Sequence, residues 1–183
     1  MAPSTRPDGP APFAPIEVQL RDGRRVRLRE IRPDDRDEVL QAFGRLSSES
    51  RYMRFMSSMR ELPPMVLERT VNPRDERELG LVAEVAAADG IDIVAGARYY
   101  IEADGETCEF AVTVADGWLR GGLASRLMRE LIEAARARGL RHMEGFVLAD
   151  NAGMIDLAHR LGFTVSSDPH DRTVAIVRLA LVK

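Results

Sequence analysis

Three of the five Asp-Gly dipeptides in this chain do most to restrict how it can fold. They lie at Asp22-Gly23, Asp89-Gly90 and Asp104-Gly105, and each stands between segments of β-compatible residues. Asp-Gly is a strong signal for a tight hairpin turn, because both residues accept the positive φ angles that such turns require. The sequence therefore predicts an antiparallel meander. Its strands are expected at 16–20, 25–31, 79–85, 91–101 and 107–114.

Two of these strands alternate in a way that assigns their faces. In the second strand Arg25, Arg27 and Arg29 alternate with apolar residues, which predicts a row of arginines on the solvated face. A nucleic-acid contact by this row is the alternative, and the formal net charge of -3 disfavours it. In the strand at 107–114, Glu109 shares its face with small residues and lies opposite an apolar face. These small residues are Thr107, Ala111 and Thr113.

Helices are predicted before and after the 79–114 strands in the sequence. After the second strand, apolar spacing predicts a helical region from Pro33 to Leu46 and two shorter helices, from 48 to about 56 and from about 63. Beyond residue 122 an i, i+4 stripe predicts the clearest helix, which Gly139 ends. The stripe consists of Leu123, Leu127, Met128, Leu131, Ile132 and Ala135.

The remainder of the chain alternates strand and helix. A strand is expected at 143–148, a helix from Asn151 to Gly162, and a last strand at 174–181. The fold class is therefore α/β (α+β mixed), with a central mixed, mostly antiparallel sheet flanked by helices. Residues 1–15 combine proline, alanine and glycine without a hydrophobic period, so a disordered tail is expected there and a single domain at 16–183.

Composition excludes several classes of function. Cys108 is the one cysteine of the 183 residues, so a disulfide framework cannot form, and His142, His159 and His170 lack metal-ligand spacing. No metal site is expected. A net charge of -3 gives no general attraction to nucleic acid or to an anionic membrane surface. No apolar stretch approaches the ~20 residues of a membrane span, and the N-terminus lacks a secretory pattern, so a cytoplasmic protein is expected.

The junction between the 107–114 strand and the next helix is the strongest candidate site. A helix N-terminus presents free amides and a partial positive charge, and glycine lets an anion approach the backbone. The two common phosphate motifs, G-x-x-x-x-G-K-[ST] and G-x-G-x-x-G, are absent. A helix that merely begins with glycines is the alternative. The candidate anion-binding residues are Arg120, Gly121, Gly122, Leu123, Ala124 and Ser125.

This junction resembles that of the GNAT acetyltransferases, which carry Q/R-x-x-G-x-G/A there. In this chain the frame reads Leu119-Arg120-Gly121-Gly122-Leu123-Ala124, so leucine takes the first place. Downstream, the chain resembles the ending of many GNAT domains at Asn151, Leu157, Leu161 and Gly162-Phe163. Segments 46–55, 96–99 and 109–112 resemble the GNAT domains of bacterial protein lysine acetyltransferases. The resemblance covers about 16–183.

The resemblance implies acetyl-CoA as the co-substrate. The backbone of Val112 and Val114 would pair with pantetheine like an added strand, and residues 120–125 would hold the pyrophosphate. The side-chain amide of Asn151 would meet the pantetheine arm, although a plain helix N-cap is the alternative and both roles are compatible.

The resemblance also implies a general base and raises the question of an acid. An amine with a pKa of ~10.4 must lose a proton before it attacks, and Glu109 is the candidate base. Its alternative role is to pair with an arginine. Many members carry a tyrosine acid where this chain has Ala158, so catalysis without that acid is expected. If an acid exists, the candidates are Tyr52, Tyr99 and Tyr100.

The expected acceptor is a primary amine. The subgroup resemblance suggests a protein lysine, such as one on an acyl-CoA synthetase. A small-molecule amine and a non-catalytic acyl-CoA-binding regulatory module remain as alternatives.

Overall fold

The computed structural model describes residues 11–74 and 76–182. The helices are α1 (Arg36–Arg45), α2 (Ser48–Phe55), α3 (Pro64–Val71), α4 (Leu123–Ala137) and α5 (Ala152–Arg160). The strands are β1 (Ile16–Gln19), β2 (Arg25–Glu30), β3 (Glu78–Ala87), β4 (Gly90–Ile101), β5 (Thr107–Val114), β6 (His142–Leu148), β7 (Thr164–Ser167) and β8 (Val174–Ala180).

The strands of the described residues form one sheet in the order β1-β2-β3-β4-β5-β6-β8-β7. The three hairpins predicted at the Asp-Gly dipeptides are β1–β2, β3–β4 and β4–β5. Every neighbouring pair is antiparallel except β5 and β6, which run parallel. The fold class predicted from the sequence is therefore confirmed.

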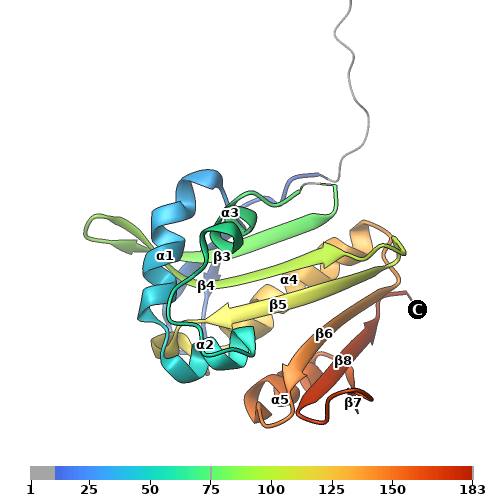
Figure 1. Cartoon of the computed structure of the whole chain (residues 1–183). Helices are drawn as coiled ribbons and strands as arrows, with labels where there is room; N and C mark the ends of the chain where they lie inside the picture. Colours follow the sequence, from blue (N-terminus) through green and yellow to red (C-terminus); the bar gives the residue numbers. More distant parts are fainter. Residues whose placement is uncertain (1–10, 75, 183) are drawn as a thin grey trace, which may run out of the picture.

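The sheet lies between two helical layers. Helices α1, α2 and α3 cover one face, while α4 crosses the other (Figure 1). The larger core fills the α4 side, and all six residues of the predicted α4 stripe are buried in it. A smaller cluster of Ile31, Leu67, Val71, Val82 and Ile93 lies on the opposite face. The α1–α3 layer is thus held by a thinner apolar contact than α4 is.

The sequence pattern does not predict β7. Only Val165 of its four residues is apolar, and the strand lies at the edge of the sheet, where it pairs with β8 alone. An edge strand with so little apolar alternation gives no period-2 signal to detect. Of the expected tail, residues 1–10 lie outside the described residues. Phe13 packs against the core, and its N–H donates to Glu30 Oε1 at 2.5 Å.

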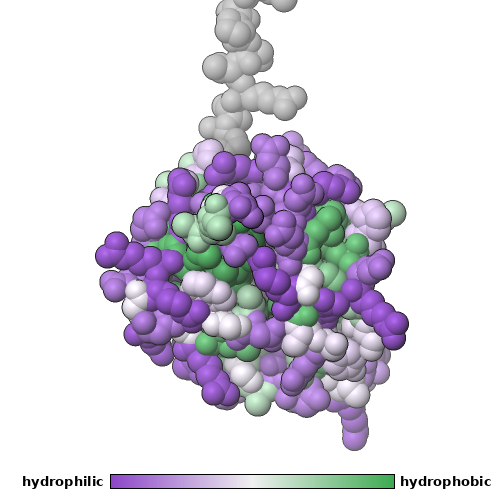
Figure 2. All heavy atoms as spheres, turned by 90° about the vertical axis from the view of Figure 1, so that its left-hand side faces the viewer, coloured by the Kyte–Doolittle hydropathy of each residue, from purple (hydrophilic) through white to green (hydrophobic). Residues whose placement is uncertain are grey.

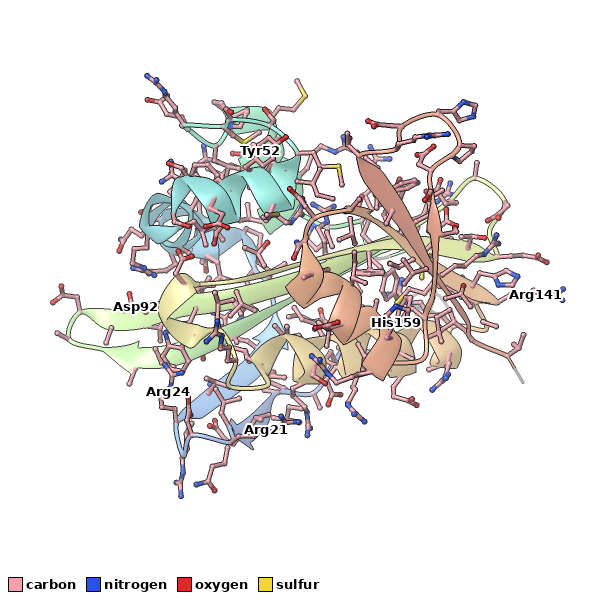
Figure 3. All side chains as sticks on the ribbon, turned by 90° about the horizontal axis from the view of Figure 1, so that it is seen from below. Arg21, Arg24, Tyr52, Asp92, Arg141 and His159 are labelled. Atoms are coloured by element: carbon pink, nitrogen blue, oxygen red, sulfur yellow. The ribbon has the colours of Figure 1, made fainter. Side chains whose placement is uncertain are left out.

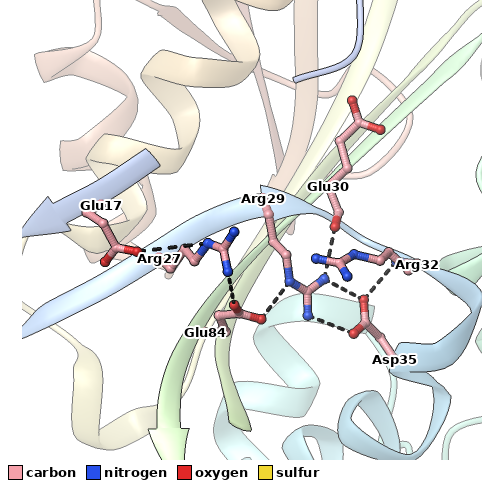
Figure 4. A network of polar contacts seen from close by, with 7 residues as sticks. All are labelled: Glu17, Arg27, Arg29, Glu30, Arg32, Asp35 and Glu84. Atoms are coloured by element: carbon pink, nitrogen blue, oxygen red, sulfur yellow. Dashed lines mark hydrogen bonds and ion pairs between the residues drawn. The ribbon is translucent and has the colours of Figure 1, made fainter. Parts of the chain in front are cut away.

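The prediction that the β2 arginines share a solvated face is wrong for Arg29. Arg25 and Arg27 are exposed, whereas Arg29 is 3% exposed. Its guanidinium donates to both Asp35 carboxylate oxygens at 2.7 and 2.8 Å and to Glu84 Oε2 at 2.6 Å (Figure 4). A buried charge is tolerated where ionic partners satisfy its donors. This network ties the turn before α1 to β2 and β3.

Candidate active site

The sheet opens where β5 and β6 separate. Their parallel register joins residues 107–109 to residues 142–144 and ends there. At the next position of β6, Gly145, a Cβ would lie 2.7 Å from the ring of Phe110. Phe110 therefore uses the space beside Gly145, and its ring packs edge-on against Phe163 with centroids 5.4 Å apart. Beyond this point the two strands diverge (Figure 1), and this edge of β5 has no partner among the described strands.

The backbone of β5 presents hydrogen-bonding groups to this opening. The Ala115 N–H donates to Val94 O at 2.9 Å, so residue 115 faces β4. In an antiparallel pair, alternate residues point their backbone groups toward the neighbouring strand and away from it. Val112 and Val114 therefore point their N–H and C=O groups away from β4, toward the opening. The two residues predicted to pair with pantetheine thus stand at the unpaired edge.

Helix α4 begins at the same end of β5 with amides that no side chain caps. Its N-cap is Gly122, whose φ of 87° favours glycine, and no side chain of the described residues accepts from the first turn. Arg120 also has a positive φ, 66°, which is uncommon for a residue with a side chain. Arg120 is exposed and Gly121 is buried. Leu123 is 1% exposed, so it can offer a ligand only its backbone.

The turn between β1 and β2 packs against this loop. The Arg24 guanidinium lies 4.0 Å from the centre of the Trp118 ring and donates to Gly117 O at 2.9 Å. It also binds Asp22 at 2.6 Å, which neutralises a carboxylate whose Oδ2 lies 3.3 Å from where a Gly121 Cβ would stand. The Asp-Gly signal predicts this turn, yet nothing local predicts that it meets a loop more than 90 residues away.

Arg21 on the same turn adds a cation beside the α4 N-terminus. Its backbone N–H donates to Gly121 O at 3.4 Å, and its Nε lies 3.7 Å from where a Gly122 Cβ would stand. Figure 3 shows Arg21 and Arg24 together on the α4 side of the sheet, away from Tyr52 on α2. The sequence pattern does not predict Arg21 as part of this site.

Glu109 lies on the opposite face of β5, where the pairing with β6 ends. The Tyr100 hydroxyl donates to its Oε2 at 2.7 Å. Burial raises the pKa of the Glu109 carboxyl above its ordinary value, and the Tyr100 hydrogen bond acts in the opposite direction. No arginine among the described residues lies within ion-pair distance of Glu109. The geometry therefore gives the carboxylate a tyrosine partner in place of the alternative arginine.

The contact between Tyr100 and Glu109 follows from the hairpin register. Strands β4 and β5 pair Tyr100 with Glu109 directly. Counting outward from Asp104-Gly105 as the two central turn residues gives the same pairing. The signal for this partner was therefore present in the sequence.

Comparison with known proteins identifies the family. The family described as "Acetyltransferase (GNAT) family" matches residues 40–163. Over 174 residues the chain is 38% identical to acetyltransferase PA5475 of Pseudomonas aeruginosa, covering 92% of this chain and 94% of that protein. The chain belongs to the GNAT family of acetyltransferases. The resemblance inferred from its motifs is confirmed, and the chain is an acetyltransferase of a family that uses acetyl-CoA.

Two further relatives are a longer acetyltransferase and the GNAT domain of another protein. The chain is 33% identical over 151 residues to acetyltransferase Pat of Mycolicibacterium smegmatis, covering 82% of this chain and 44% of Pat. The chain thus spans less than half the length of that relative. The solved GNAT domain of S. lividans PAT superposes with a TM-score of 0.83 at 28% identity, covering 91% of this chain and 96% of that domain.

The position of the usual GNAT tyrosine is closed in this chain. Ala158 is 0% exposed, so a tyrosine there would have to displace core side chains. His159 is exposed on α5, as expected for a surface histidine. Tyr99 is also fully buried, and burial raises its pKa to about 12. Tyr52 is exposed on α2. Of the three tyrosines, Tyr100 is the one that is hydrogen-bonded to Glu109.

Asn151 caps α5. Its side-chain oxygen accepts from the Met154 N–H at 3.1 Å, and its own backbone N–H donates to Leu148 O at 2.9 Å. The N-cap role is therefore confirmed. The side-chain NH₂ is left for any contact with a ligand. Within the described residues, no helix has the length and apolar character needed to cross a bilayer.

Proposed function

We propose that the chain transfers the acetyl group of acetyl-CoA to a primary amine, with a protein lysine as the acceptor. The observation that carries this proposal is the Glu109 carboxyl, hydrogen-bonded by Tyr100, at the point where β5 and β6 separate. The lysine acceptor is supported by the likeness to Pat and to the S. lividans PAT domain. A lysine on an acyl-CoA synthetase is the acceptor that we propose first.

Acetyl-CoA would bind along the opening between β5 and β6. Val112 and Val114 would pair with the amide groups of pantetheine, because their backbone groups face the opening. The uncapped amides at the start of α4 would receive the pyrophosphate, as helix N-termini do for phosphate groups. These amides belong to Gly121, Gly122, Leu123, Ala124 and Ser125, with Arg120 and Arg21 as adjacent cations. The Asn151 side-chain NH₂ would meet the pantetheine arm from the α5 side.

Glu109 would prepare the acceptor for attack. A lysine amine is mostly protonated at neutral pH, so Glu109 takes one proton from it, directly or through a water molecule. The amine nitrogen then bonds to the thioester carbonyl carbon, the carbon–sulfur bond breaks, and CoA leaves with the electron pair. The nitrogen gives up its second proton either to the departing sulfur, which then leaves as a thiol, or to water, in which case CoA leaves as a thiolate. A thiol pKa of ~8.5 makes that departure possible without a dedicated acid. This chemistry is therefore compatible with a buried alanine at position 158 in place of the tyrosine acid.

Glu109→Gln tests the proposal. Turnover, measured as thiol released with an acyl-CoA synthetase as acceptor, is expected to fall roughly 10²–10⁴-fold, the usual contribution of a general base. Acetyl-CoA affinity, measured by calorimetry, should remain. Glu106→Gln, which changes an exposed carboxylate nearby, is the matched control. Wild-type turnover in Glu109→Gln would contradict the assignment, and CoA binding without turnover on any amine would favour the regulatory module.

A further inference from the structure

A pocket lies between the α1–α3 layer and the face of the sheet that carries Glu109. Its volume is about 170 Å³. Apolar side chains such as Phe43, Phe55 and Leu62 form its walls. It begins next to Glu109, because Ala111 is the following residue on the same face of β5. Its floor consists of small residues from β3, β4 and β5 and of the residue that follows β5, namely Gly80, Gly96, Ala111, Thr113 and Ala115.

The room on this floor depends on the absence of side chains. A Cβ on Gly96 would have one neighbour within 4 Å, the backbone oxygen of Leu81 at 3.6 Å. A side chain at this position would therefore extend into the pocket without striking the protein. Figure 2 shows the side of the molecule with α1 and α2, where apolar surface lies recessed between polar side chains.

Two arginines are the charged residues that line this apolar pocket. Arg98 on β4 is paired, since its guanidinium lies 3.2 Å from Glu78 Oε2. Arg54 on α2 has no carboxylate within 4.0 Å among the described residues. Burial and the nearby charge of Arg98 lower the pKa of Arg54 to about 10, so it remains a cation at neutral pH.

A partly buried guanidinium without an anionic partner is costly in an apolar setting. Its planar donors match a carboxylate in a bidentate geometry, and such charge-assisted bonds are the stronger ones. The cation lies near enough to Glu109 to influence the pKa of that carboxyl. An amine held at Glu109 and a carboxylate held at Arg54 would therefore belong to one ligand.

We propose that Arg54 binds a carboxylate of the acceptor while the pocket holds its apolar part and Glu109 receives its amine. This inference rests on the proposed acetyl transfer and narrows the acceptor to amines that carry an acid group close by. The carboxylate has two sources, the α-carboxylate of a free amino acid or an acidic side chain beside a lysine. Both present the same chemistry to Arg54.

Two pairs of acceptors distinguish these sources. One pair is L-methionine and L-methioninamide; the other is the capped dipeptides acetyl-Glu-Lys-amide and acetyl-Gln-Lys-amide. The wild-type protein should favour the acid member of one pair by roughly 10–100-fold in kcat/KM, the usual effect of a hydrogen bond to a charged group. Preference in the first pair identifies the α-carboxylate, and preference in the second identifies an acidic neighbour.

Three variants test the residues. Arg54→Gln should remove the preference for the acid, and Gly96→Val should raise KM for the preferred acceptor by filling the floor. Arg69→Gln, an exposed arginine of α3 outside the pocket, is the matched control and should keep the preference. Melting temperatures and circular dichroism of all variants show whether each is folded.

Acetylation of both members of each pair without preference would overturn the inference and leave the proposed acetyl transfer intact. If none of the four acceptors is acetylated, the assay with an acyl-CoA synthetase decides the proposed acetyl transfer separately. In that case calorimetry with N-acetyl-L-methionine and its amide decides the inference, because binding needs no turnover. Binding of the acid that Arg54→Gln and Gly96→Val weaken supports the carboxylate site, and equal or absent binding overturns it.

Discussion

Tyr100→Phe should move the acidic limb of the pH–rate profile. Glu109 acts as a base only when it is ionised, so kcat/KM should rise with pH as this carboxyl loses its proton. The Tyr100 hydroxyl donates to Glu109 at 2.7 Å and favours the ionised form. Removing this donor raises the pKa of Glu109 further. The rising limb should therefore shift to higher pH, and the value of kcat/KM on the plateau should not change.

The expected size follows from the exposure of the pair. A hydrogen bond to a charged group contributes ~1.5–3 kcal/mol. Tyr100 is 37% exposed, so solvent screening reduces its contribution to about 1.4 kcal/mol, which is tenfold in an equilibrium constant. On the acidic limb, the ionised fraction of Glu109 and hence kcat/KM should fall by roughly tenfold in the variant.

The assay is thiol release from acetyl-CoA across the pH range, with a saturating and a limiting concentration of acceptor. Tyr52→Phe, which removes the hydroxyl of an exposed tyrosine on α2, serves as the control and should leave the profile unchanged. An unshifted limb in Tyr100→Phe would show that the hydrogen bond does not influence the base. A bell-shaped wild-type profile whose falling limb disappears in Tyr100→Phe would instead make Tyr100 the general acid.

Three further outcomes are expected. Gly122→Glu should abolish the stabilisation of the fold by acetyl-CoA in a thermal-shift assay. Gly122→Ala, which also places a Cβ at this positive φ but adds no charge, should retain part of the stabilisation. Equal effects of the two variants would place the pyrophosphate elsewhere. Intact mass after incubation with acetyl-CoA should show at most two added acetyl groups, because Lys183 and the N-terminus are the available amines, and a third would contradict amine-directed transfer. In denaturant unfolding, Arg29→Met should lower the free energy of unfolding by about 3–5 kcal/mol, since buried Asp35 loses its cationic partner and buried Glu84 keeps only Arg27. Exposed Arg27→Met should lower it by at most ~1 kcal/mol, and similar losses in the two variants would refute a role for burial.

Local signals in the sequence predict most of the fold. The α4 stripe is predicted residue for residue, because a helix packed on a sheet repeats its apolar positions at a fixed spacing. The hairpins follow from the Asp-Gly dipeptides for an equally local reason. The weak apolar content of β7 hides it, since an edge strand need not bury a continuous face. An element can be predicted from its own residues where their spacing alone determines which of them are buried.

The site was only partly predictable for the opposite reason. The positions of Val112 and Val114 on an open edge depend on Phe110 filling the space beside Gly145, a contact between two strands. Arg29 looks like its exposed neighbours, and one of the two acidic partners that distinguish it, Glu84, lies 55 positions away in the chain. Such features come from tertiary contacts, which alternation within one strand does not encode.

The short pairing between β5 and β6 has a consequence for how the protein unfolds. Only three residue pairs form the strand pairing between the antiparallel meander and the β6–β8 section within the described residues, although one apolar core underlies both. Because the hydrogen bonding at the middle of the sheet is this short, local opening is expected to begin there. A pantetheine chain hydrogen-bonded along the open edge of β5 would bridge that seam. Substrate binding would then oppose this local opening.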